Sequence, residues 1–279
     1  MKLEKALNKA KQQRLERIAV AEKALEEAGP KADALEQGQW QAPVYNQSRC
    51  LAPDGATAIT NRCVGLQHNV PDMEYYKVLR TQLMQRMQPK GWNTVMVTSV
   101  RPGEGKTLTA INLAMTFAMA YNQTALLVDC DLRQPSVYRH LGIASERGIV
   151  DYLVDKRPLS ELIIWPKVEK LSLISGGRTA AQSAELLGSP RMRELMAEMK
   201  SRYSDRYLIV DAPPILVGAD TLTLAPLVDG IVVVVESGGP PLKEIQEAVA
   251  LIPKERFLGF VLNKHTSRRN GYYQYYKTT

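Results

Sequence analysis

The sequence contains few cysteines and no long apolar run. Its three cysteines, Cys50, Cys63 and Cys130, lack metal-ligand spacing and cannot all pair with one another, which favours a reducing compartment. The longest apolar run, from Ile231 to Val235, is far too short to span a membrane, and no apolar segment of a secretory signal follows the first lysines. These absences predict a soluble, cytoplasmic protein unless a partner tethers it.

Acidic residues are in deficit relative to basic ones. Lys and Arg total 36 against 29 for Asp and Glu, which gives a net charge of +7 in 279 residues. The excess gathers locally at Lys2, Lys5, Lys9, Lys11, Arg14 and Arg17 and at Lys264, His265, Arg268 and Arg269. Such a balance permits attraction to phosphates, nucleic acid or an anionic membrane face. The length accommodates one sizeable α/β domain with appendages, or two small domains.

The segment around which the chain is organised runs from Val95 to Leu113. A β-branched apolar run ends at Ser99, a Pro-Gly-Glu-Gly turn follows at 102–105, and apolar residues at helical spacing begin after Lys106. A loop between a strand and a helix presents backbone N–H groups and a positive dipole end to phosphates. The expected nucleotide-binding residues are Pro102, Gly103, Glu104, Gly105, Lys106, Thr107 and Leu108.

Within this phosphate-binding loop, or P-loop, two side chains have specific expected roles. Lys106 is expected to contact the β- and γ-phosphates of ATP, and the Thr107 hydroxyl is placed to bind Mg²⁺. The first glycine of the usual pattern is replaced by Val100, five residues before Gly105. An ordinary strand-to-helix turn that happens to contain Gly-Lys-Thr is therefore the alternative.

Two further apolar runs end in aspartate. The run from Ala125 ends in Asp129-x-Asp131-x-Arg133, and the run from Tyr207 ends at Asp211, before two prolines. Ligands of doubly wound folds bind at the carboxyl edge of the sheet, where such strand ends lie. Carboxylates this close suit Mg²⁺ coordination and acceptance of a hydroxyl proton. Helix-capping and turn-forming aspartates are the alternative, which the second acidic strand end disfavours.

The order of these segments predicts the fold class. Six strands are expected, at 95–99, 125–129, 171–175, 207–211, 231–236 and 258–262. Helices are expected at 72–87, 106–121, 148–154, 184–203 and 242–251. Strands alternating with helices predict an α/β protein with a doubly wound, mostly parallel sheet flanked by helices.

The remaining segments suggest appendages. Residues 1–29 read as an amphipathic helix, and 30–71 as a linker with a short strand near 58–64. The P-loop domain then covers 72–263, and 264–279 forms a mobile basic tail. Four tyrosines gather in that tail, Tyr272, Tyr273, Tyr275 and Tyr276. A short aromatic segment docked on the domain is the alternative for this cluster.

Taken together, these motifs resemble those of the bacterial tyrosine autokinases associated with exopolysaccharide and capsule export. That family belongs to the MinD/ParA-like branch of P-loop ATPases. The resemblance covers about residues 72–279, and the N-terminal helix is similar to that of freestanding kinases accompanying exosortase-type loci. The matching motifs are Thr98-Ser99-x-x-Pro102-Gly103-x-Gly105-Lys106-Thr107, Val128-Asp129-x-Asp131-x-Arg133-x-Pro135, Ile209-Val210-Asp211-x-Pro213-Pro214 and the tyrosine cluster. The replaced first glycine is usual in this family.

The resemblance implies roles for the site residues. The catalytic set is Lys106, Asp129, Asp131 and Arg133, the metal set is Thr107, Asp129 and Asp211, and Asn263 lies beside the adenine. Which of Asp129 and Asp131 is the base stays open. Arg101 stands where partitioning ATPases place a lysine that reaches across a dimer, although a solvated loop arginine is the simpler explanation.

The resemblance also implies partners. In the family, a helix face Glu-x-x-Arg-x-x-Arg builds a ring in which the tail of one subunit enters the site of the next. Here that face reads Glu74-x-x-Lys77-x-x-Arg80, and lysine lacks the planar fork of arginine. A solvated charged stripe is the alternative. The expected partners are further copies of the chain, a separate membrane chain-length-determinant protein that activates it at the inner membrane, and a tyrosine phosphatase. No nucleic acid is expected.

Two functions follow from these motifs. The first is an ATP- and Mg²⁺-dependent protein-tyrosine autokinase that phosphorylates its tail in trans and regulates exopolysaccharide polymerisation and export. The second is a nucleotide-switched scaffold ATPase of the MinD/ParA type without kinase activity. The second function leaves the tyrosine cluster without a role.

Overall fold

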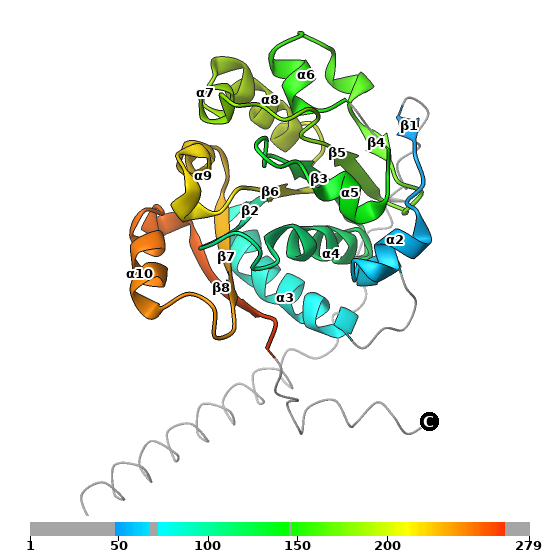
Figure 1. Cartoon of the computed structure of the whole chain (residues 1–279). Helices are drawn as coiled ribbons and strands as arrows, with labels where there is room; N and C mark the ends of the chain where they lie inside the picture. Colours follow the sequence, from blue (N-terminus) through cyan, green and yellow to red (C-terminus); the bar gives the residue numbers. More distant parts are fainter. Residues whose placement is uncertain (1–47, 67–71, 145–146, 266–279) are drawn as a thin grey trace, which may run out of the picture. The chain divides into compact units, whose positions relative to one another are not determined.

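The computed structural model describes residues 48–66, 72–144 and 147–265, and these residues form an eight-stranded sheet with the order β1-β4-β5-β3-β6-β2-β7-β8 (Figure 1). The strands are β1 (Arg49–Cys50), β2 (Thr94–Ser99), β3 (Thr124–Asp129), β4 (Ile164–Trp165), β5 (Leu171–Ile174), β6 (Arg206–Asp211), β7 (Gly230–Glu236) and β8 (Phe257–Asn263). Neighbouring strands run parallel except β4 and β5, which are antiparallel. The predicted α/β class with a mostly parallel sheet is confirmed.

Helices cover both faces of the sheet. One face carries α2 (Gly55–Thr60), α3 (Asp72–Met87), α4 (Lys106–Ala118) and α5 (Val137–Leu141). The other carries α6 (Ile149–Leu153), α7 (Ser183–Leu187), α8 (Pro190–Ser201), α9 (Asp220–Leu224) and α10 (Leu242–Ala250). Short 3-10 helices lie at Val64–Leu66, Gln88–Lys90, Leu159–Glu161, Ile215–Val217, Ala225–Leu227 and Lys254–Arg256. In the described part of the chain, every helix is too short or too polar to span a bilayer.

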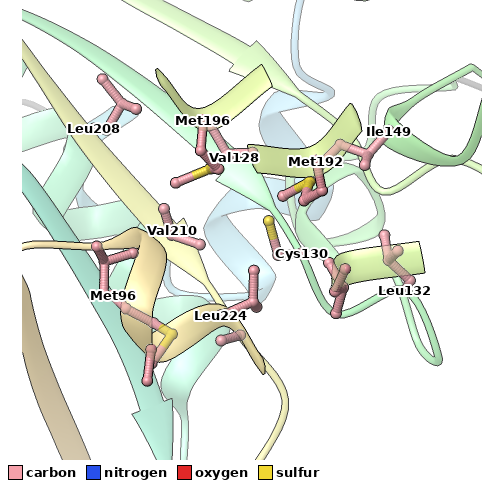
Figure 2. Packing of buried hydrophobic residues seen from close by; sticks show 14 of the residues in the cluster. Met96, Val128, Cys130, Leu132, Ile149, Met192, Met196, Leu208, Val210 and Leu224 are labelled. Atoms are coloured by element: carbon pink, nitrogen blue, oxygen red, sulfur yellow. The ribbon is translucent and has the colours of Figure 1, made fainter. Parts of the chain in front are cut away.

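The central strands are apolar on both faces because both faces are covered. Successive residues alternate between the two cores, so that Val95 packs with α4 while Met96 packs with the helices of the opposite face. Figure 2 shows this second core, in which Met192 and Met196 of α8 lie against Val128 of β3. Because the central strands are buried on both faces, their carboxyl ends are held side by side at one edge of the sheet.

The six strands predicted from apolar runs are all present, at nearly the predicted bounds. The two-residue strands β1 and β4 were not predicted, because two residues carry no detectable periodicity. The predicted helix at 184–203 is wrong as a single element. It is divided into α7 and α8 at Gly188, after which Ser189 caps α8 by accepting a hydrogen bond from the Met192 N–H. Pro190 then occupies the first turn, where its missing N–H costs nothing.

Two other boundaries differ from the prediction. The P-loop helix ends at Ala118 rather than near residue 121. The short strand expected near 58–64 is wrong, since α2 occupies 55–60 and begins where Asp54 accepts a hydrogen bond from the Thr57 N–H. Residues 48–66, which composition assigned to the linker, add β1 to the sheet and bury Ala58 and Cys63 beside α4. The predicted N-terminal helix at 1–29 lies outside the described residues.

Candidate active site

The P-loop connects β2 to α4 and has the backbone geometry that a phosphate cradle needs. Gly103 and Gly105 have φ angles of 83° and 96°, in the left-handed region that favours glycine. Gly105 is also the N-cap of α4, so the helix begins at Lys106 with its first N–H groups directed toward the loop. The loop therefore combines exposed backbone donors with the positive end of a helix dipole.

Carboxylates from two neighbouring strand ends converge on Lys106. Its Nζ lies 2.7 Å from Oδ2 of Asp131 and 3.6 Å from Oδ1 of Asp211. The Thr107 hydroxyl donates a hydrogen bond of 2.7 Å to Oδ2 of Asp211. The parallel sheet explains this meeting, because β3 and β6 are adjacent and Asp129 pairs with Asp211 in register.

Asp129 is fully buried and positions the start of α5. Its Oδ2 accepts hydrogen bonds from the N–H groups of Ser136 (2.8 Å) and Val137 (3.0 Å), and its Oδ1 accepts one from the N–H of Asp131. Burial and the nearby Asp211 carboxylate raise the pKa of Asp129 to about 7, although its backbone donors act in the opposite direction. A carboxyl with this pKa can change its proton near neutral pH.

The other charges at the site are also perturbed. Burial raises the pKa of Asp211, although the Lys106 ammonium and the Thr107 hydroxyl stabilise its ionised form. Burial alone would lower the pKa of Lys106, but the Asp211 and Asp131 carboxylates outweigh it and raise that pKa. The site therefore holds one ammonium group among several buried carboxyls.

The residues fit a magnesium ion that is shared with a nucleotide. In the described residues, Oδ1 of the fully buried Asp211 accepts no hydrogen bond, and such an atom is a natural ligand of a hard cation. No cluster of three or more His, Cys, Asp or Glu side chains able to hold a metal occurs in the part of the chain that the structure describes. A magnesium ion here would need phosphate oxygens and water to complete its coordination, which is usual for nucleotide-bound magnesium.

The buried Glu104 side chain, within the P-loop, and Asn263, at the end of β8, fix the P-loop through hydrogen bonds. Glu104 is 2% exposed, and its carboxylate accepts hydrogen bonds from the N–H groups of Arg101 (2.7 Å) and Glu236 (3.4 Å). Asn263, at the end of β8, donates from Nδ2 to the carbonyl oxygen of Glu104 at 2.8 Å. A Cβ atom on Gly105 would lie only 2.1 Å from that nitrogen. The end of β8 is therefore packed directly on the P-loop.

Arg133 does not join the cluster around Lys106. Its Nε donates to Oδ2 of the buried Asp220 (3.0 Å) and to the Ser183 hydroxyl (3.1 Å), and its Nη2 lies 2.9 Å from the same Asp220 oxygen. This ion pair joins the loop after β3 to the first turn of α9. Arg101 is likewise engaged within the chain, because its guanidinium binds both carboxylate oxygens of Glu244 in α10.

The three residues expected at a subunit contact also have partners within the chain. Lys77 forms an ion pair of 2.6 Å with Glu74, one turn earlier in α3. Arg80 donates from Nη1 to the carbonyl oxygen of Thr116, near the end of α4. Burial lowers the pKa of Arg80, although the Glu74 carboxylate favours its ionised form. The four tail tyrosines, Tyr272, Tyr273, Tyr275 and Tyr276, lie outside the described residues.

Sequence reasoning missed three residues of this region. Ser136, whose hydroxyl lies 3.2 Å from that of Thr107, is the N-cap of α5, and Asp220 is the first residue of the short helix α9; neither stands at a distinctive spacing. Glu244 lies in the first turn of a helix, where acidic residues are common for dipole reasons alone. Only its position in the segment after the strand that ends at Asp211 could have pointed to Asp220, because the segments that follow strands at this edge of a doubly wound sheet line the ligand site.

Comparison with known proteins shows the class of protein to which this chain belongs. A family model described as an AAA domain matches residues 93–252, more than half of the chain and the whole region from β2 to α10. The chain is thus a P-loop nucleotide-binding protein of the AAA-domain family. The kinase domain of VpsO has the same fold, with a TM-score of 0.61 and 28% identity over 70% of this chain and 97% of that domain.

Two relatives define the family more closely. The chain is 32% identical to the tyrosine-protein kinase YwqD of Bacillus subtilis (strain 168), over 78% of this chain and 95% of YwqD. It is also 32% identical to the tyrosine-protein kinase CpsD of Streptococcus pneumoniae serotype 4, over 68% of this chain and 83% of CpsD. The chain belongs to the family of bacterial tyrosine-protein kinases, as the motif resemblance predicted. The alternative of a scaffold ATPase without kinase activity is not favoured.

Proposed function

We propose that this chain is an ATP- and Mg²⁺-dependent protein-tyrosine kinase that phosphorylates the tyrosines of its own C-terminal tail. Four tyrosines, Tyr272, Tyr273, Tyr275 and Tyr276, are the proposed acceptors. The observation that carries the proposal is the meeting of Lys106, Thr107, Asp131 and Asp211 at the start of α4. Family membership supports the reaction, because the relatives YwqD and CpsD are named as tyrosine-protein kinases.

The proposed mechanism consists of positioning and charge neutralisation. The N–H groups of the loop 102–108 and the Lys106 ammonium bind the phosphates of ATP, and Asn263 lies on the adenine side. Thr107, Asp129 and Asp211 would hold a magnesium ion. When bound, that ion neutralises charge on the phosphate oxygens. The incoming tyrosine hydroxyl loses its proton to a carboxylate of Asp129 or Asp131, and each of these is within two residues of the end of β3.

In the proposed reaction, Arg133 acts on the transferred group only if it leaves its ion pair. Its guanidinium is held by Asp220 and Ser183. We therefore assign Arg133 to positioning of the loop after β3. The catalytic role that the motif implied for Arg133 stays a prediction.

The proposal also covers the assembly of the kinase into a ring and the proteins that regulate it. Transfer in trans within a ring uses Glu74, Lys77 and Arg80 of α3, and the half-exposed Glu74–Lys77 pair can exchange its partners at low cost. A separate membrane chain-length-determinant protein would recruit the kinase to the inner membrane and activate it, and a tyrosine phosphatase would reverse the modification. Each phosphate adds about −1.5 to −2 charges, so a multiply modified tail would repel its neighbours and release the ring. That cycle would regulate exopolysaccharide polymerisation and export.

The test of the reaction is intact mass and phosphopeptide mapping after incubation with ATP and Mg²⁺. We expect phosphates on the peptide that contains residues 272–276, and none in Lys106→Met. Lys243→Met, which removes an exposed lysine of α10, is the matched control and should retain phosphorylation. A tail that stays unmodified in a chain that turns over ATP, even when the cytoplasmic segment of a candidate activator is added, would contradict the kinase proposal and favour the scaffold function. A Tyr-to-Glu tail variant with the same mass in solution as the unmodified protein would contradict release of the ring by charge.

A further inference from the structure

The chain leaves β8 through a fixed turn. We call residues 263–265 the tail root, because the tyrosine-rich segment follows them. Lys264 has a φ angle of 56°, a left-handed conformation that few residues other than glycine adopt. Its Nζ lies 3.1 Å from Oε2 of Glu236 at the end of β7. The N–H of Ser237 donates to the carbonyl oxygen of Asn263 at 2.9 Å, and the Ser237 hydroxyl lies 3.1 Å from Nδ1 of His265.

The same residues contact the P-loop. Asn263 donates from its side chain to the carbonyl oxygen of Glu104, and the N–H of Glu236 donates to the Glu104 carboxylate. Glu104 itself is buried within the loop and also accepts a hydrogen bond from the N–H of Arg101. The tail root and the phosphate-binding loop are thus two sides of one hydrogen-bonded unit.

Stability alone gives no reason for this arrangement. The Lys264–Glu236 pair is more than one-third exposed on both sides, and exposed ion pairs contribute little to folding. The conformation of Lys264 is itself unfavourable, and strained residues persist where the surroundings determine a particular direction of the chain. A strand end with no further role would be expected to fray instead.

We propose that Glu104, Glu236 and Lys264 couple occupancy of the P-loop to the direction in which the C-terminal tail leaves the sheet. This inference rests on the proposed function, since it treats the tail as the phosphorylated segment. Phosphates that restrain the P-loop also restrain its contacts with Asn263 and Glu236, and the tail root is held in its turn. The coupling is reciprocal, so a fixed tail root favours the nucleotide-bound loop.

The length of the tail makes its initial direction important. Tyr272 follows Lys264 by eight residues, so it lies within roughly 27 Å of the root even in a fully extended chain. Over so short a tether, the direction at the root controls the local concentration of tyrosine at any given site. Fixing the root would therefore raise the rate of tail phosphorylation without changing the chemistry at Lys106.

Three variants test the coupling in the full chain. Lys264→Gly removes the ion pair and relaxes the φ strain, and Lys264→Arg retains the charge. Lys243→Gln, the control, removes a more exposed ion pair within α10, away from the tail root. At saturating ATP and Mg²⁺, we expect Lys264→Gly to phosphorylate the tail at least fivefold more slowly. The same variant should phosphorylate an added tyrosine peptide within twofold of the parent at saturating nucleotide. Because the coupling is reciprocal, it should bind a fluorescent ADP analogue more weakly than the parent does. The other two variants should match the parent in every assay.

Two results would overturn the coupling in these assays. One is a tail rate of Lys264→Gly within twofold of the parent. The other is an equal fall in the peptide rate, which would mean that Lys264 merely supports the site.

A second measurement does not depend on kinase activity. Hydrogen exchange of the peptide 257–265 should slow when ADP and Mg²⁺ are added, and this response should be lost in Lys264→Gly. An exchange rate of this peptide that is the same with and without nucleotide in the parent chain would refute the coupling even if the tail is phosphorylated. A response to nucleotide in a chain that makes no phosphotyrosine would preserve the coupling and refute the proposed kinase function.

Discussion

The Lys106 ammonium and the Asp131 carboxylate form an ion pair of 2.7 Å at the mouth of the P-loop. Both side chains are almost completely buried, and the same ammonium lies 3.6 Å from Oδ1 of Asp211, so the two carboxylates share one buried cation. Triphosphate oxygens would compete with Asp131 for the same ammonium. Binding of ATP is thereby linked to release of a carboxylate two residues beyond the end of β3, where a proton acceptor for tyrosine is needed.

This relationship predicts opposite effects of Asp131→Asn on binding and on chemistry. Removing the charge frees Lys106 for phosphates, so ADP should bind at least as tightly as in the parent chain. Loss of a general base typically costs 10²–10⁴ in rate, and we expect tail phosphorylation to fall by about that factor if Asp131 is the base. Titration calorimetry and single-turnover phosphorylation measure the two effects. A rate within threefold of the parent would transfer the role to Asp129.

The raised pKa of Asp129 predicts how stability depends on pH. Its folded pKa of about 7 exceeds the ordinary value of 3.8, so the folded chain keeps a proton that the unfolded chain releases. The stabilising contribution is complete below about pH 4 and is lost as pH rises through 7, by at most about 1.4 kcal/mol per pH unit. Chemical unfolding of the nucleotide-free chain at pH 5 to 8 should show this decline, and Asp129→Asn should flatten it.

A matched control accompanies this pH series. Glu247→Gln removes an exposed carboxyl of α10 and should leave the slope of the parent chain unchanged. The interpretation fails if Asp129→Asn and Glu247→Gln have the same pH dependence. Added ADP and Mg²⁺ should also reduce the slope in the parent chain, because cation binding favours the ionised carboxylate.

Much of this fold was predictable because its central strands are buried on both faces. A strand such as Ile231–Val235 must then be apolar at every position, and a run of that kind is visible in the sequence. The edge elements lack this constraint. Strand β1 is only two residues long and is specified by hydrogen bonds to Ile163 and Trp165, more than one hundred residues away. Such long-range pairing leaves no local pattern.

The candidate site divides in the same way. Lys106 and Asp211 were predictable because glycines and strand ends mark their positions along the chain. The partners of Arg133 and Glu104 were not, because Asp220 at the start of α9 and Glu236 at the end of β7 reach them through contacts between elements far apart in the sequence. Motif spacing therefore located the residues proposed to bind nucleotide and metal more readily than the residues that position the surrounding loops.

The Arg133–Asp220 ion pair predicts a measurable coupling. Asp220 is 1% exposed, so Arg133→Gln leaves a buried carboxylate without its guanidinium and should lower the free energy of unfolding by about 1–3 kcal/mol. Adding Asp220→Asn removes the stranded charge, and the double variant should lose less than the sum of the single losses. Urea unfolding measures all three variants. Arg178→Gln, at a more exposed pair with Asp155, is the control and should change stability by less than about 0.5 kcal/mol. Additive losses would show that the pair contributes no coupling.

The contact between Gly105 and Asn263 predicts that the P-loop tolerates no side chain at residue 105. Gly105→Ala would combine a φ of 96° with a Cβ atom 2.1 Å from Nδ2 of Asn263, so we expect a loss of about 1–3 kcal/mol in stability and at least tenfold weaker ADP binding. Gly91→Ala has a similar φ of 65° but meets no atom within 4 Å, and it should bind ADP normally. Adding Asn263→Ala to Gly105→Ala removes the steric contact and should restore part of the melting temperature. If the double variant melts no higher than Gly105→Ala alone, backbone strain rather than the packing of β8 on the loop explains the requirement for glycine.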